Sequence, residues 1–178
     1  MSARYSRHLR VIHWSTAVLV AVQVAFALLN IALYEPRPIL AETLVQAHIS
    51  LGAVLFILTL VRLAARWYSP TSPRSDNAAL LFAARAGHAA LYACLLALPI
   101  TGYLKLAALG FTVTPFGVLP LPPMSLNVPL AQFADQAHDL IALGLGGLLV
   151  LHIAAAVFHR RLDGRRVLHH ISLRGGAS

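Results

Sequence analysis

Four long apolar stretches without charged side chains dominate the sequence, over residues 11–34, 43–61, 86–104 and 140–159. Each approaches the roughly 20 residues that an α-helix needs to span the hydrocarbon of a bilayer. The chain is 58% hydrophobic and only 11% charged, far from the average of a soluble globular protein. We therefore predict an all-α integral membrane four-helix bundle, formed as one membrane domain over residues 1–178. Its transmembrane helices are expected at approximately 10–34, 42–66, 80–105 and 133–160.

The connection between the third and fourth stretches has a different composition. Five prolines lie within residues 107–130. This segment is too rich in proline for another spanning helix and too apolar for a free linker. We expect it to pack over the outer end of the bundle.

Positive charge is distributed unevenly beside the predicted helices. Of the 14 lysines and arginines, all but Arg37 and Lys105 lie at the N-terminus, around the loop between the second and third helices, or in the C-terminal tail. The positive-inside rule therefore places both termini in the cytoplasm. The net charge of +8 is explained by anchoring beside anionic lipid, so nucleic acid is not an expected partner. The first apolar run is too long for a cleaved signal peptide, and we expect it to be retained.

Cysteine usage restricts the chemistry. Cys94 is the single cysteine, which excludes an intrachain disulfide, a cysteine-rich zinc site and the motif for covalent haem attachment. Any haem is expected to be held noncovalently.

Histidine is the most informative polar residue, because ionisable side chains are costly at membrane depth and mark functional sites there. His138 and His152 lie 14 residues apart in the fourth stretch. In an α-helix this spacing puts them on nearly the same face, about 21 Å apart along the axis. His48 lies early in the second helix and His13 early in the first. The depths therefore match in two pairs, His48 with His138 at the outer side and His13 with His152 at the inner side.

Two histidines that face each other at one depth can ligate a haem iron from both sides, and the apolar macrocycle suits a bundle interior. A zinc ion usually takes more ligands at one level, often including a carboxylate. The sequence thus predicts two b-type haems, whose iron is bound by His13, His48, His138 and His152. Gly52, one turn after His48, could leave room for a haem. Arg62 could either anchor the helix at the membrane surface or pair with a haem propionate.

Two further histidines lie close to the predicted cytoplasmic boundary. A single membrane histidine often has only a structural, hydrogen-bonded role, and this applies best to His88 and His159. Both are also candidates to bind a quinone carbonyl or to relay protons, because histidine titrates in the useful range. At its depth, His88 could also replace His13 as an inner ligand.

Short motifs surround these histidines in a fixed order along the chain. They are Tyr5-Ser6 before Ile12-His13-Trp14, His48 with Gly52 and Val61-Arg62-Leu63, Gly87-His88 with Tyr92, Leu98-Pro99 and Gly102, and His138 with Leu151-His152 and His159. In order and spacing they resemble the bacterial di-haem cytochrome b561 family. The resemblance extends from Tyr5 to about Arg160, and it implies a multi-pass protein of the bacterial inner membrane.

The resemblance implies a four-helix bundle with two b haems on the four paired histidines, and with quinone handled at the membrane. The most similar members look like superoxide oxidases, which oxidise superoxide and pass the electrons to ubiquinone. Superoxide is an anion, yet Arg37 and Lys105 are the only cations expected at the outer face, against four carboxylates. Of these two, Lys105 is favoured as the steering residue because it ends the third helix near the depth of the outer haem.

Two other functions remain open from the sequence. The bundle also resembles the cytochrome b subunits that link a hydrogenase or dehydrogenase to the quinone pool, which act with a redox partner protein. A haem-free transporter that uses histidines for metal passage is the second alternative, and it would lack a b-type absorption band. A homodimer is compatible with each of these.

Overall fold

The part of the chain that the structure describes is built from four long α-helices. The computed structural model describes residues 7–68 and 78–162, with side chains for residues 10–68 and 78–158. The helices are α1 (Arg7–Leu33), α2 (Pro38–Tyr68), α3 (Ala78–Ala107) and α4 (Val128–Leu162), with one 3-10 turn, η1 (Pro115–Gly117), before α4. All four helices are long and apolar enough to cross a membrane. The predicted all-α class with four membrane-length helices is confirmed.

Each helix begins a few residues before its predicted start, and the difference is largest for α4. The side chain of Asn127 accepts a hydrogen bond from the backbone N–H of Leu130 at 3.0 Å, as an N-cap residue does. Pro129 therefore lies in the first turn of the helix, where a missing N–H has no cost. In the sequence, Pro129 indicated an irregular connection, but in the structure it lies in the first turn of α4.

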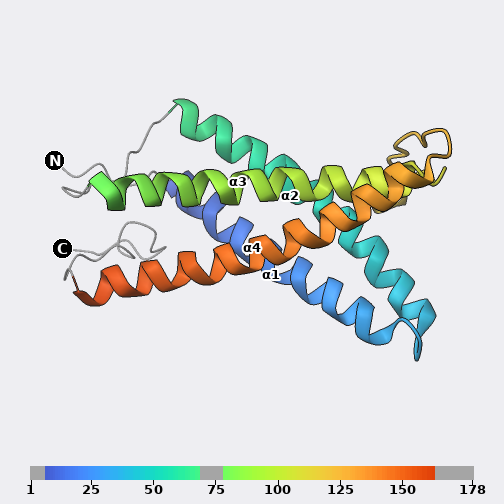
Figure 1. Ribbon diagram of the computed structural model, residues 1–178, viewed down its shortest axis with the longest axis horizontal. Helices are drawn as coiled ribbons and strands as arrows, with labels where there is room; N and C mark the ends of the chain where they lie inside the picture. Colours follow the sequence, from blue (N-terminus) through green and yellow to red (C-terminus); the bar gives the residue numbers. More distant parts are fainter. Residues whose placement is uncertain (1–6, 69–77, 163–178) are drawn as a thin grey trace.

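The helices pair as two hairpins that cross each other (Figure 1). α1 packs on α2 and α3 packs on α4, with a smaller contact between α2 and α3. Along the described residues, no Cα atom of α4 comes within 8 Å of a Cα atom in α1 or α2. Any contact between α4 and the α1–α2 hairpin is therefore made by side chains rather than by closely packed backbones.

The two ends of the bundle differ in charge. α1 begins and α4 ends at the same end of the bundle (Figure 1). We call it the arginine end, after Arg10, Arg62, Arg66 and Arg85. The other end is called the capped end, because residues 108–127 connect α3 to α4 there.

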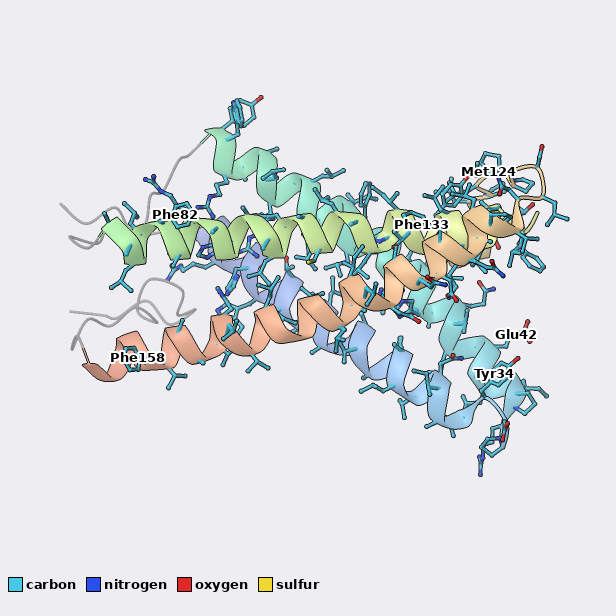
Figure 2. All side chains as sticks on the ribbon, viewed as in Figure 1. Tyr34, Glu42, Phe82, Met124, Phe133 and Phe158 are labelled. Atoms are coloured by element: carbon cyan, nitrogen blue, oxygen red, sulfur yellow. The ribbon has the colours of Figure 1, made fainter. Side chains whose placement is uncertain are left out.

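The buried centre of the bundle is a single apolar layer. It takes one side chain from each helix, namely Val20, Leu55, Leu95 and Leu145. Most other large apolar side chains are exposed and project outward from all four helices, among them Phe82, Phe133 and Phe158 (Figure 2). Such an extensive apolar surface fits contact with lipid rather than water.

Residues 108–127 fold back over the capped end, where they were expected. Ala107 and Ala108 are fully buried, and their carbonyls accept hydrogen bonds from the N–H groups of Met124 and Asn127 at 2.9 and 2.8 Å. The N–H of Phe116 donates to the Ser50 hydroxyl on α2 at 2.9 Å. The segment thus ties the α3–α4 hairpin to α2.

Candidate functional site

Five histidines lie at two levels on either side of the apolar layer. Each is seven residues from the layer residue of its own helix: His13 from Val20, His48 from Leu55, His88 from Leu95, and both His138 and His152 from Leu145. Seven residues are about two helical turns, so each histidine shares a face with its layer residue, about 10 Å along the axis. The layer therefore separates an imidazole cluster at the capped end from one at the arginine end.

At the capped end, His48 of α2 faces His138 of α4. Their ring centroids are 6.3 Å apart. Metal–nitrogen bonds to imidazole are about 2 Å long, so two rings on opposite sides of one metal have centroids roughly 6 Å apart once a ring radius is added at each end. The spacing of this pair therefore suits two axial ligands of one iron.

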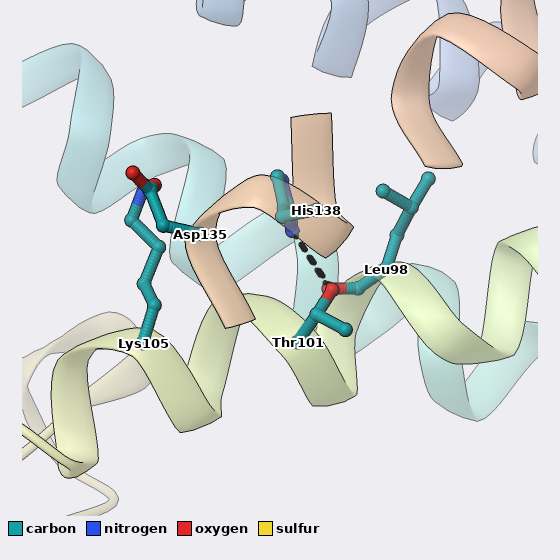
Figure 3. A network of polar contacts seen from close by, with 5 residues as sticks. All are labelled: Leu98, Thr101, Lys105, Asp135 and His138. Atoms are coloured by element: carbon teal, nitrogen blue, oxygen red, sulfur yellow. Dashed lines mark hydrogen bonds and ion pairs between the residues drawn. The ribbon is translucent and has the colours of Figure 1, made fainter. Parts of the chain in front are cut away.

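The backbone of α3 holds the ring of His138. Its Nδ1 lies 3.1 Å from the carbonyl oxygen of Leu98 and 3.2 Å from the Thr101 hydroxyl (Figure 3). A carbonyl can only accept, so Nδ1 carries the proton and Nε2 keeps its lone pair. Metal-binding histidines are usually oriented by such a bond. A Cβ at Gly102 would lie 3.3 Å from Cε1 of His138, so glycine permits this close approach.

His48 is held through its backbone instead. The Nε2 amide of Gln23 donates to the His48 carbonyl at 3.0 Å. Gly52 makes room for this amide, because a Cβ at Gly52 would lie 3.1 Å from Gln23 Nε2. The structure thus places Gly52 against Gln23, a residue that the sequence interpretation did not select, although an amide within an apolar stretch is a recognisable signal.

At the arginine end, the rings of His88 on α3 and His152 on α4 have centroids 5.4 Å apart, the shortest of the ring contacts among the described residues. Nδ1 of His88 donates to the Ala84 carbonyl at 2.6 Å, which leaves Nε2 with its lone pair. His13 of α1 lies near enough to interact electrostatically with both rings. Three imidazoles therefore gather at this level, namely the pair expected from the sequence and His88, for which the sequence also indicated a similar depth.

Arg62 connects three helices at the same level. Its guanidinium nitrogen lies 2.9 Å from Nδ1 of His13, and its Cζ lies 5.6 Å from the centre of the Tyr92 ring. A guanidinium can only donate, so Nδ1 of His13 accepts. Arg62 thus points into the bundle in this structure. Tyr92 was part of a sequence motif but was given no role from the sequence.

The imidazoles fit b-type haem better than a compact metal site. Within the part of the chain that the structure describes, no group of three or more His, Cys, Asp or Glu side chains could hold a metal ion. The capped-end pair has haem-like spacing, and Nδ1 of His48 is buried without a hydrogen-bond partner. His48 and His138 also come from helices whose backbones do not touch, so the space between them is bounded by side chains alone. These residues would hold a haem iron.

The remaining candidate residues lie further from the rings. Lys105 forms an ion pair with Asp135 across α3 and α4, and its charge acts on both His138 and His48 (Figure 3). Arg37 is exposed in the turn between α1 and α2, which lies apart from the α3–α4 connection (Figure 1). His159 lies in α4, but its side chain is outside the described residues. Lys105 is therefore the candidate cation next to the capped-end pair.

Comparison with known proteins agrees with this architecture. Residues 4–171 match the family described as prokaryotic cytochrome b561. Cytochrome b561 homolog 2 of Escherichia coli (strain K12) is 31% identical over 160 residues, which cover 85% of this chain and 81% of that protein. Probable superoxide oxidase CybB of Yersinia pestis is 27% identical over 150 residues, which cover 83% and 84%. The chain belongs to the prokaryotic cytochrome b561 family and is a multi-pass membrane protein of b-haem electron transfer.

Proposed function

We propose that this protein is a superoxide:ubiquinone oxidoreductase of the bacterial inner membrane with two b haems. The observation that carries the proposal is the pair of imidazole clusters on opposite sides of one apolar layer, with His138 and His152 on the same face of α4. When bound, the two haems would supply single-electron transfer, and iron whose open positions were taken by histidines would be a poor site for binding oxygen. Two superoxide anions, one quinone and two protons then give two oxygen molecules and one quinol.

We assign His48 and His138 to the haem at the capped end, and His13 and His152 to the haem at the arginine end. The contact with Arg62 is the reason that His13, rather than the neighbouring His88, is assigned as the second ligand beside His152. If His13 held the iron through Nε2, the proton of its neutral imidazole would lie on Nδ1, which could then no longer accept from Arg62. Arg62 would then be free to pair with a haem propionate, whose carboxylate is a better partner for a guanidinium than an imidazole is.

The remaining residues handle the anion, the quinone and the protons. Lys105 attracts superoxide to the capped end, with Arg37 as a second, more distant cation. His88 and His159 pass protons to the quinone at the arginine end. His88 can donate to a quinone carbonyl only in its imidazolium form, because the proton on its Nδ1 is bonded to the Ala84 carbonyl. The central layer of Val20, Leu55, Leu95 and Leu145 keeps water out of the space between the two levels. The layer therefore opposes the movement of protons between the two levels.

The superoxide part of the proposal is supported by the Yersinia pestis relative, whose name is that of a probable superoxide oxidase. It is tested with the purified haem-loaded protein in detergent, by following superoxide consumption and the haem absorption bands with and without ubiquinone. Rapid haem reduction and ubiquinone-dependent turnover are expected. If the haems ignore superoxide yet reduce ubiquinone from another reductant, the protein is instead an electron-transfer subunit for a redox partner.

A further inference from the structure

A cationic pocket of about 370 Å³ lies between α2 and α3 at the arginine end. It is lined by Leu63, Arg66, Arg85, His88, Ala89 and Tyr92. The lining contains two guanidiniums, an imidazole and a phenol, but no carboxylate. The last turns of α2 diverge here from the first turns of α3 (Figure 1).

The two arginines of this pocket have no counter-ion within the described chain. Arg66 is half-buried and Arg85 is exposed, and neither forms an ion pair or hydrogen bond with a described residue. Arg62, one turn before Arg66, differs because it is engaged with His13 and Tyr92. The carboxylates of the described residues all lie toward the capped end: Glu35, Glu42, Asp135 and Asp139. A half-buried guanidinium without a partner is costly, so this pocket favours an anion.

The position of the pocket along the membrane indicates which anion it takes. Trp67 and Tyr68, directly after Arg66, are each 85% exposed. Tryptophan and tyrosine gather at the level of lipid headgroups, so Arg66 lies at that depth. Toward the middle of the bilayer, α2 exposes Leu60 and Leu63 beside the pocket. The surroundings therefore match a phosphate at the level of the headgroups and acyl chains toward the middle of the bilayer.

We propose that Arg66 and Arg85 bind the phosphate of an anionic lipid headgroup. Guanidiniums recognise phosphate through paired, charge-assisted hydrogen bonds, and basic pockets between transmembrane helices on the cytoplasmic side are suited to anionic lipids. Leu63 and Ala89 form the walls of the headgroup site, and the acyl chains follow the exposed leucines of α2. The proposal does not depend on the superoxide activity.

The test is native mass spectrometry of the purified haem-loaded protein in micelles that contain phosphatidylglycerol or phosphatidylcholine. The wild type is expected to retain phosphatidylglycerol in preference to phosphatidylcholine. The double variant Arg66→Gln/Arg85→Gln is expected to retain about tenfold less phosphatidylglycerol, because the hydrogen bonds from the two charged groups are removed. Arg37→Gln removes the same kind of charge from the capped end and should retain the lipid. Haem content, read from the absorption spectrum, confirms that each variant is folded.

A second variant keeps the test decisive if the double variant does not fold. Ala89→Trp fills the pocket with both arginines in place, and it should also release phosphatidylglycerol. Unchanged retention in either folded variant overturns the proposal. An adduct of inorganic phosphate that excludes the lipid would show that the pocket takes free phosphate. A raised KM for ubiquinone with full lipid retention would show that the two arginines, and not His88 alone, serve the quinone.

Discussion

At the scale of single residues, Gly102 offers a sharp test of the site at the capped end. Gly102→Ala puts a Cβ about 3.3 Å from the His138 ring, so the ring must shift against its bonds to Leu98 and Thr101. An off-rotamer side chain costs roughly 0.5–1.5 kcal/mol, which corresponds to weaker haem retention by up to about tenfold. The haem-to-protein ratio, measured from the pyridine haemochrome spectrum, should fall from about two toward about one, because only the haem at the capped end is affected.

Gly87→Ala is the matched control, because a Cβ at Gly87 meets no heavy atom within 4 Å. It should keep the full haem content. Equal haem loss in both variants would mean that general damage to α3, rather than contact with His138, is responsible.

The ligands at the arginine end are separated by two alanine substitutions. His13→Ala should lower the haem content from about two per protein to about one, since an axial ligand is lost. His88→Ala should keep about two haems but slow ubiquinone reduction by at least about tenfold, as expected when an acid–base group is removed. Haem quantification and single-turnover reduction measure the two effects. Haem loss in His88→Ala with both haems kept in His13→Ala would reverse the assignment.

The sequence predicted the depth of these residues better than their contacts. Depth follows from the fixed rise of a helix, so the 14-residue spacing of His138 and His152 was enough to define two levels. Contacts of Arg62 depend on how three helices pack, and the sequence left its direction open. The Thr101 and Leu98 contacts of His138 likewise join residues from separate helices.

At the scale of elements, the helices were predictable because a lipid-exposed backbone must satisfy its own hydrogen bonds, which leaves few alternatives to an apolar helix. The start of α4 was less so, because it depends on the Asn127 cap and on the tolerance of proline in a first turn. The partnership of Lys105 with Asp135 was not foreseen, since it requires the crossing of α3 and α4.

The ion pair between Lys105 and Asp135 offers a way to change the rate at which superoxide reaches the capped end. Its side chains are 37% and 51% exposed, so it contributes only about 0–1 kcal/mol to stability. Asp135→Asn frees the charge of Lys105 and should raise the rate of haem reduction by superoxide by up to about tenfold at low salt. Lys105→Glu should lower that rate. Stopped-flow spectroscopy at several ionic strengths measures both, and the differences should disappear at high salt.

Asp139→Asn is the control for net charge, because it removes a carboxylate near His138 that does not pair with Lys105. It should raise the rate less than Asp135→Asn does. If Lys105→Glu changes neither the rate nor its salt dependence, Lys105 has no steering role.

At the scale of the whole molecule, the charge asymmetry and the two imidazole levels together give the bundle a direction. The arginine end is proposed to face the cytoplasm, and the capped end the outside. Since a charged species crosses hydrocarbon only at high cost, the orientation decides which pool of superoxide reaches Lys105. Orientation is therefore a functional property of this protein as well as a topological one.

Cysteine labelling in spheroplasts tests this orientation. In a Cys94→Ala background, which removes the only native thiol, Leu119→Cys places a thiol on the exposed cap and Trp67→Cys places one at the exposed end of α2. A membrane-impermeant maleimide should label Leu119→Cys in closed spheroplasts, and Trp67→Cys only after lysis. The reverse pattern would place the arginine end outside and Lys105 in the cytoplasm. The protein would then draw on superoxide produced inside the cell, and the steering argument would apply to that pool.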